Sequence, residues 1–172
     1  MAALACGLGL GLSGAAAQPA VSEAGVKAAY LYKFLAYVEW PATALPAAGA
    51  PFVIGVVEAD AVHADLVLAV SDRQLNGHPV VARKLGGDDS LDGVHALFIG
   101  RGASRARWLE RAKGRPLLLV TDAAQGLEGG SMINFVASDG RVRFEASQAA
   151  AEGAGLRLSA RLLMVAERVV LR

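Results

Sequence analysis

A glycine-rich turn directly follows the apolar segment 94–99, and its residue types and spacing could bind an anion. Gly100 and Gly102 begin like the phosphate-binding turn of dinucleotide-binding domains, with Arg101 and Arg105 beside them. Arg105 stands where that motif needs its third glycine. A helix that begins here would still present free N–H groups to an anion. The turn therefore indicates either an anion site or an ordinary solvated connection, which is the commoner of the two.

Asp122 follows the apolar segment 116–121 and is expected at the carboxyl end of a parallel sheet, where open α/β folds bind ligands. It has no evident catalytic partner in the sequence. His63, His78 and His95 are scattered and lack the spacing of metal ligands. His95 lies in an apolar segment, where a hydrogen-bonded core histidine is commoner than a ligand. The sequence therefore predicts no metal site.

Nucleophile motifs are incomplete. Gly129-Gly130-Ser131 begins like a nucleophile elbow, but the second glycine of that motif is missing. The one cysteine, Cys6, lies in the first seventeen residues, so the rest of the chain has no thiol nucleophile and no disulfide. We therefore predict a binding or regulatory domain that is not an enzyme and needs no cofactor.

Length and composition predict one globular domain. The chain has 172 residues, of which 54% are hydrophobic and 19% charged, so a packed core is expected. A formal net charge of +1 argues against nucleic acid as the main partner. Residues 1–17 are uncharged and end in three alanines, which is typical of a signal peptide cleaved after Ala17, although the basic start is missing. We expect residues 18–172 to form a single exported domain; a flexible Ala/Gly-rich tail is the alternative for 1–17.

Hydrophobic periodicity predicts strands that alternate with helices. A helix is expected over 22–39, with Ser22 as its N-cap, Val26 and Tyr30 on its apolar stripe and Pro41 after its end. The elements expected next are strand 51–58, helix 60–70, strand 78–85, strand 94–100, helix 104–114 and strand 116–122. This alternation implies parallel pairing with right-handed crossovers.

The C-terminal third predicts a hairpin and a last helix. Asp139-Gly140 is a strong turn signal, and a turn there sets Phe135 opposite Phe144. One face, expected to be buried, then carries Ile133, Phe135, Ala137, Val142, Phe144 and Ala146, and the other carries Met132, Asn134, Val136, Arg143 and Glu145. Ser159 is expected to begin a helix that reaches Val170. The predicted fold class is therefore α/β: a mostly parallel sheet flanked by helices, with a C-terminal antiparallel hairpin and a final helix.

Eleven consecutive residues that begin at Tyr30 hold five of the ten aromatic residues in the chain. In a continuous helix, Tyr30, Phe34 and Tyr37 share one face, whereas Tyr32 and Trp40 point elsewhere. The rings off the main face either cover the loop that follows or form an exposed or dimer-facing anchor, since Tyr and Trp are favoured at interface hot spots.

Seven segments, in this order and spacing, resemble the YfiR family, also called the DUF4154 domain: VKAAYLYKFLAYVEWP, FVIGVVE, VHALFIG, LLLVTD, GGSMINFV, GRVRFEAS and LRLSARLLMVAERV. The resemblance implies a periplasmic, dimeric α/β protein without enzymatic activity. It implies that the protein binds the periplasmic portion of an inner-membrane, YfiN-like diguanylate cyclase and holds the cyclase inactive. An OmpA-type, YfiB-like outer-membrane lipoprotein is implied as a second partner. Where family members often carry a cysteine, this chain has Val94, so a redox-sensing role is not expected.

Two functions remain open at this point. The first is repression of the cyclase, for which the candidate partner-binding residues are Tyr32, Tyr37, Trp40, Met132 and Asn134. The alternative is a small-molecule-binding sensor domain that feeds a membrane signalling protein. Its candidate ligand residues are Arg101, Arg105 and Asp122. The genes beside this one would separate the two hypotheses.

Overall fold

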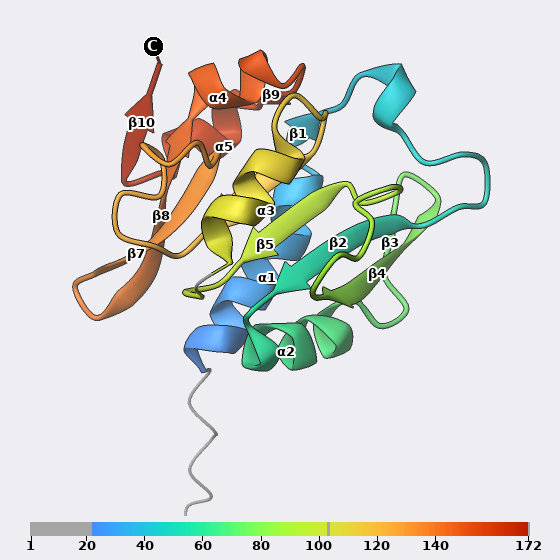
Figure 1. Cartoon of the computed structure of the whole chain (residues 1–172), viewed down its shortest axis with the longest axis horizontal. Helices are drawn as coiled ribbons and strands as arrows, with labels where there is room; N and C mark the ends of the chain where they lie inside the picture. The colour runs from blue at the N-terminus through green and yellow to red at the C-terminus, as the bar shows by residue number, and fades with distance from the viewer. Residues whose placement is uncertain (1–21, 103, 172) are drawn as a thin grey trace, which may run out of the picture.

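An eight-stranded sheet forms the centre of the computed structural model, which describes residues 22–102 and 104–171 (Figure 1). Its strands are β2 (Phe52–Val57), β3 (Gln74–Leu75), β4 (His78–Leu85), β5 (Ala96–Ile99), β6 (Leu118–Thr121), β7 (Ile133–Ser138), β8 (Arg141–Ser147) and β10 (Arg168–Val170). Their order across the sheet is β10-β8-β7-β6-β5-β2-β4-β3. The expected signal peptide, its cleavage site after Ala17 and Cys6 lie outside the described residues.

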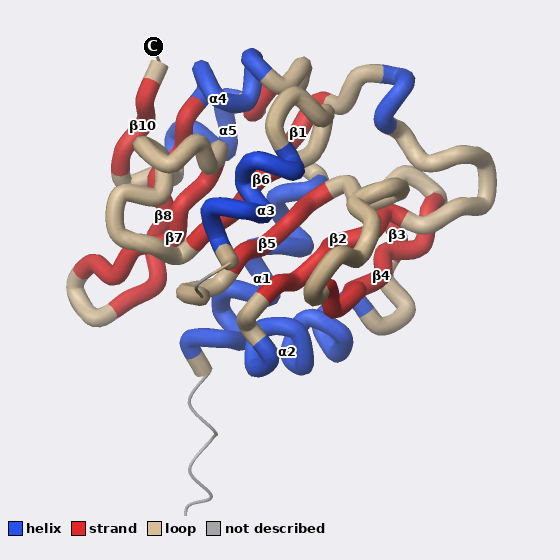
Figure 2. The backbone as a smooth tube through the Cα atoms, viewed as in Figure 1, coloured by secondary structure: helices blue, strands red, loops and turns tan. Residues whose placement is uncertain are grey.

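Helices cover both faces of this sheet. Helices α1 (Glu23–Leu35) and α2 (Asp60–Val70) lie on one face, and α3 (Arg105–Ala112) lies on the other (Figure 1). Figure 2 shows β6 passing beneath α3. Because both faces are covered, β5 and β6 are buried at every position, as is usual for parallel strands. None of the helices in the described residues has the length and apolar character that a membrane crossing requires.

The remaining short elements lie along the top of the view in Figure 1, from the side of β10 across to the side of β2 and β3. They are β1 (Val38–Glu39), the short 3-10 helix η1 (Ala42–Ala44), α4 (Gln148–Gly153), β9 (Arg157–Leu158) and α5 (Ala160–Met164). Strands β1 and β9 pair with each other in a separate two-stranded antiparallel sheet. This small sheet ties the chain after α1 to the chain before α5.

The strand order creates a switch point between β2 and β5. The chain leaves β2 for β4 on one side and then crosses back to β5 on the other side. All strand pairs from β4 to β7 are parallel, and β7 and β8 form an antiparallel hairpin. The predicted fold class is confirmed. Open sheets of this kind bind ligands outside the carboxyl ends of the strands at the switch point, so that edge is the first place to look for a site.

Helix α1 is shorter than predicted. Its N-cap is confirmed, because the Ser22 hydroxyl accepts the N–H of Gly25 at 2.9 Å. The helix ends at Leu35 and not at residue 39, because the chain turns there and Val38-Glu39 pair with β9. The buried residues of the helix are Lys27, Ala28, Leu31, Phe34 and Leu35. The apolar stripe is therefore rotated by about one residue from the predicted stripe through Val26 and Tyr30, and a lysine lies on it.

The register of the hairpin β7–β8 is confirmed. Phe135 lies opposite Phe144, and Asp139 and Gly140 have φ values of 51° and 69°, as a two-residue type I′ turn requires. The predicted burial is correct only at the base of the hairpin. Ala137 is exposed and Val142 half-buried because the tip extends beyond the core, whereas Met132 and Asn134 on the other face are buried.

The predicted final helix is also wrong in its second half. Ser159 caps α5 as expected, but α5 ends at Met164. Residues Arg168–Val170 then form β10, which pairs in parallel with β8. Two β-branched valines favour an extended chain, and β8 has a free edge that only the folded sheet provides.

Candidate functional site

The aromatic residues of α1 mostly pack inside the protein. Tyr30 and Phe34 stack on each other with ring centroids 5.6 Å apart. Phe34 also meets Phe135 at 5.8 Å and the edge of Phe144 at 5.0 Å. This cluster joins α1 to the base of the hairpin, so two of the five aromatic residues of this segment have a packing role there.

The three aromatic residues proposed for partner binding lie in different environments. The Tyr32 hydroxyl donates to the carbonyl oxygen of Gln74 at 3.4 Å, and its ring is partly buried. The Trp40 indole packs 6.1 Å from the ring of Phe52 and donates to a backbone carbonyl of α1. Tyr37 is 39% exposed, because α1 ends before it and the ring does not follow the helix face. Of the three, Tyr37 offers the most surface to a partner.

Met132 and Asn134 are 3% and 1% exposed, so burial gives them a structural role in this conformation. The Asn134 Oδ1 accepts hydrogen bonds from the Thr121 hydroxyl at 2.8 Å and from the N–H of Ala123 at 3.0 Å. A Cβ on Gly126 would lie 2.2 Å from the same oxygen, so the loop needs glycine to pack on it. The amide fixes the loop that follows β6 and is not available to a partner.

A buried ion pair occupies the carboxyl edge of the sheet. Lys27 on α1 places its Nζ 2.7 Å from Oδ2 of Asp122, and their side chains are 7% and 11% exposed. The Arg101 Nε donates to the carbonyl oxygen of Asp122 at 2.8 Å and lies 3.7 Å from its Oδ2. Lys27 also contacts Glu23 at 2.5 Å and lowers the pKa of Glu23, first by the hydrogen bond and then by its charge. Two of the candidate ligand residues, Arg101 and Asp122, are thus brought together but bind each other.

The N-terminus of α3 already holds a carboxylate. Glu58, which follows β2 with φ 51°, accepts the N–H of Ser104 through Oε1 at 3.4 Å. A Cβ on Gly102 would lie 1.5 Å from Oε2 of Glu58, so a side chain at that position would displace this carboxylate. An anion at this helix end, beside Arg105, would first have to displace Glu58.

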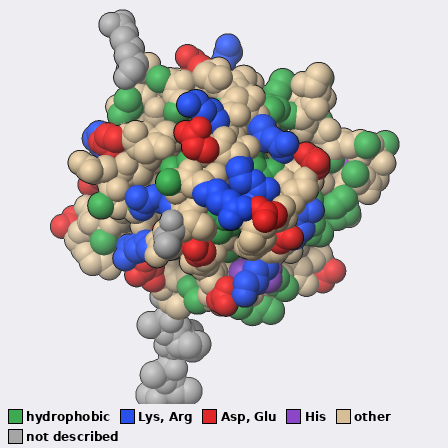
Figure 3. All heavy atoms as spheres, viewed as in Figure 1, with side chains coloured by type: hydrophobic (Ala, Val, Ile, Leu, Met, Phe, Trp, Pro, Cys, Tyr) green, Lys and Arg blue, Asp and Glu red, His purple; other side chains and the backbone are tan. Residues whose placement is uncertain are grey.

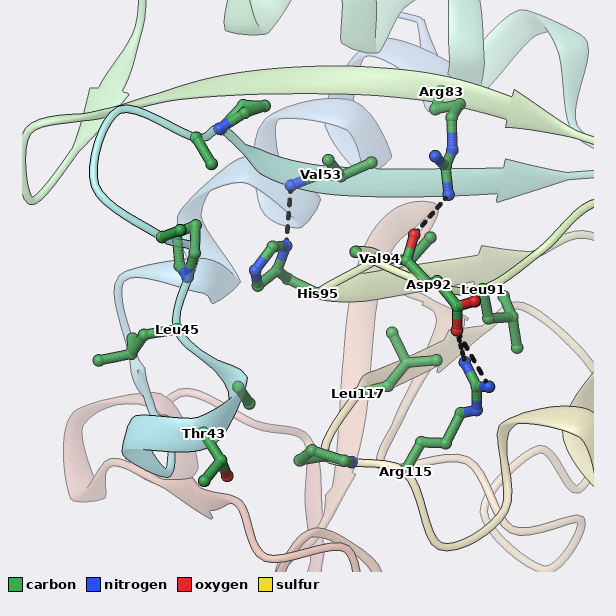
Figure 4. Close-up of a pocket in the computed structure, with 17 residues that line it drawn as sticks. Thr43, Leu45, Val53, Arg83, Leu91, Asp92, Val94, His95, Arg115 and Leu117 are labelled. Carbon is green, nitrogen blue, oxygen red and sulfur yellow. Dashed lines mark hydrogen bonds and ion pairs between the residues drawn. The ribbon is translucent and has the colours of Figure 1, made fainter.

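A cavity of about 580 Å³ lies at the opposite, amino-terminal end of β2 and β5 (Figure 4). Nδ1 of His95 at its wall accepts the N–H of Val53 at 3.1 Å, which leaves the proton of the neutral ring on Nε2. Burial, and then the charge of His78, lowers the pKa of His95 below its ordinary value of 6.5. The prediction of a hydrogen-bonded core histidine is confirmed. In the part of the chain that the structure describes, no group of three or more His, Cys, Asp or Glu side chains is placed to hold a metal ion.

Most of the basic residues around α3 contact carboxylate or carbonyl groups within the protein. Basic and acidic side chains alternate on the face shown in Figure 3. Arg107 pairs with Asp88, Arg115 pairs with Asp92, and Arg111 donates to backbone carbonyls of the loop between β4 and β5. These ion pairs fix that loop over the sheet, so this basic surface has little free charge for a ligand.

Two residues at this edge, Lys27 and Glu58, were missed in the sequence analysis. Lys27 had a signal, because it occupies the i−4 position of Leu31 on a stripe that is otherwise apolar. A buried lysine in such a stripe needs a carboxylate partner. Glu58 had no such signal, because its role depends on how close the two chain turns after β2 and β5 approach each other.

These features define a regulatory or binding domain whose polar groups at the ligand-binding edge of the fold are paired internally. The family model described as YfiR/HmsC-like (DUF4154) matches residues 24–167, and the chain belongs to this family. The family is regulatory and not catalytic, and membership supports a role in cyclic di-GMP signalling. No curated protein matches the chain.

Proposed function

We propose that the protein is a periplasmic regulator that represses an inner-membrane diguanylate cyclase by binding the periplasmic domain of the cyclase. Membership of the YfiR/HmsC-like family is the observation that carries this proposal. The expected signal peptide over 1–17 adds support for export. The protein is not an enzyme in this proposal and acts by changing how much of the cyclase is active.

The arrangement at the carboxyl edge of the sheet favours this role over ligand sensing. Asp122 is held by Lys27 and Arg101, and Glu58 fills the N-terminus of α3. A small ligand at this switch point would have to break these internal contacts before it bound. A regulator that works by protein contact needs no open site there.

Deletion of the gene tests the proposal. Cellular cyclic di-GMP and biofilm formation should rise in the deletion strain, and the rise should disappear when the cyclase gene beside it is deleted as well. The exported protein should also bind the purified full-length cyclase in detergent, as measured by isothermal titration calorimetry. An unchanged cyclic di-GMP level in a strain that normally expresses the protein would contradict the proposal.

Two further partners belong to this proposal. An OmpA-type outer-membrane lipoprotein would sequester the regulator and so release the cyclase. The regulator itself would form a homodimer. Sedimentation velocity of the exported protein measures its oligomeric state, and a monomer across the accessible concentration range would rule the homodimer out.

A further inference from the structure

A cleft of about 780 Å³ lies between the first half of α1 and the tip of the hairpin β7–β8. Arg101, which follows β5, also lines it, so the cleft lies at the carboxyl end of the sheet. Its apolar lining consists of Val26, Tyr30, Phe135, Val136, Ala137 and Val142. Figure 1 shows the tip of the hairpin projecting beyond the other elements.

The cleft has an excess of basic side chains. Its charged lining consists of Lys27, Arg101, Arg141, Arg143 and Glu23. Four of these five side chains are cationic, in a protein whose formal net charge is only +1. A concave surface with one predominant sign of charge concentrates the field and attracts ligands of opposite sign.

Arg141 and Arg143 supply the free part of this charge. Both side chains are exposed at the rim of the cleft. Within the described residues, no carboxylate forms an ion pair with either guanidinium. Arg107 in α3 and Arg115 after it differ in this respect, because each is paired with an aspartate.

Lys27 also lines the cleft, but its charge is held within the protein. An ammonium group carries three N–H groups, and Glu23 and Asp122 accept two of them. The lysine is 5% exposed and held by two carboxylates, so its position is fixed before anything binds.

We infer that this cleft binds an acidic segment of the protein partner, with a carboxylate side chain at Arg141 and Arg143 on the rim and an apolar neighbour against Tyr30. The inference rests on the proposed function, since it assigns the surface through which the cyclase is bound. It also requires the periplasmic domain of the cyclase to present Asp or Glu residues beside an apolar side chain.

The position of the charges favours a protein segment over a small anion. Arg141 and Arg143 are solvated at the rim, where a charge guides encounter and fixes the register of a protein interface but adds little affinity for a small molecule. A small-molecule site instead encloses most of its ligand behind apolar walls. The surface around the cleft can continue a protein contact along α1 and the hairpin.

The test measures binding of the exported protein to the purified full-length cyclase by isothermal titration calorimetry. Arg141→Glu combined with Arg143→Glu should weaken binding at least about tenfold, because two attractive charges become repulsive. Arg141→Lys with Arg143→Lys keeps the charge and should bind within about threefold of wild type. The matched control, Arg161→Glu with Lys113→Glu, makes the same charge change on exposed positions of α5 and the end of α3 and should bind like wild type.

Each outcome has a distinct meaning. If wild type binds and the hairpin reversal binds equally well, the cleft assignment is wrong and the proposed function stands. If wild type does not bind the cyclase, both the proposed function and this docking role are wrong. If millimolar free glutamate displaces the cyclase from wild type, the cleft takes small anions and the protein-segment assignment is wrong. Thermal unfolding of the reversed variant at the wild-type temperature excludes a folding defect as the cause of weaker binding.

Discussion

Asp122→Asn should destabilise the protein strongly, because it leaves the buried ammonium of Lys27 without its buried counter-charge. The two groups lie 2.7 Å apart, and their side chains are 7% and 11% exposed, so water cannot replace the lost partner. Removing one member of a buried ion pair costs about 3–5 kcal/mol. Glu23 still contacts Lys27 at 2.5 Å, and its side chain is 63% exposed, so we expect a loss near the lower limit, about 3 kcal/mol.

Urea denaturation followed by circular dichroism measures this loss, and thermal unfolding gives a second estimate. For a domain of this size, about 3 kcal/mol corresponds to a fall in melting temperature of roughly 6–12 °C. Asp92→Asn is the matched control. Asp92 also pairs with an arginine, but its side chain is 82% exposed, so the urea midpoint should not change measurably.

A double variant separates the unpaired charge from the lost contact. Lys27→Met with Asp122→Leu removes both charges and fills the site with apolar side chains, which is often neutral or stabilising for a buried pair. It should therefore be more stable than Asp122→Asn alone. The reasoning is refuted if Asp122→Asn behaves like the Asp92 control, or if the double variant is the less stable of the two.

Three further predictions concern the core and the carboxyl edge of the sheet. Gly100→Ala should lower stability more than Gly102→Ala. The new Cβ at position 100 would lie 2.3 Å from the backbone oxygen of Glu58, whereas the new Cβ at position 102 would meet only the movable carboxylate of Glu58. Equal urea midpoints for the two variants would contradict this. The pKa of His95 is lowered in the folded state, so the unfolded chain binds its proton first and stability should fall as the pH drops below about 6.5. A His95→Asn variant should lose that part of the pH dependence in urea titrations at several pH values. Phe144→Ala should cost about 3–5 kcal/mol in the same assay, because the ring is 2% exposed within the aromatic cluster, and a cost under about 1 kcal/mol would mean that the cluster is not tightly packed.

Local patterns in the sequence were sufficient for the parallel part of the fold. Helix 60–70 was predicted with the boundaries it has, and the three apolar strands that are buried on both faces were predicted within a few residues. The boundaries of such helices and strands can be predicted because their periodicity and their end signals lie within the segment itself. Asp139-Gly140 fixed the hairpin register for the same reason, since a two-residue turn leaves only one pairing.

Two of the errors in secondary structure lie where a distant strand competes with a local helix. Val38-Glu39 and Arg168–Val170 were both predicted as helical, and both are strands that pair with partners remote in the sequence. No property of these short segments reveals the free strand edge that they meet. Only the folded sheet supplies it, and its hydrogen bonds then outweigh weak local helix preference.

For the candidate site, too, some features could be predicted from the sequence and others depend on the tertiary structure. The sequence by itself determined that Arg101 and Asp122 reach the carboxyl edge of the sheet, because each follows an apolar strand. Tertiary structure alone decided what they do there: Lys27 arrives from α1, 95 residues away in the chain, and binds Asp122, while Glu58 occupies the end of α3. Charge neutralisation depends on distances of a few ångströms between separate elements, and residue order does not specify those distances.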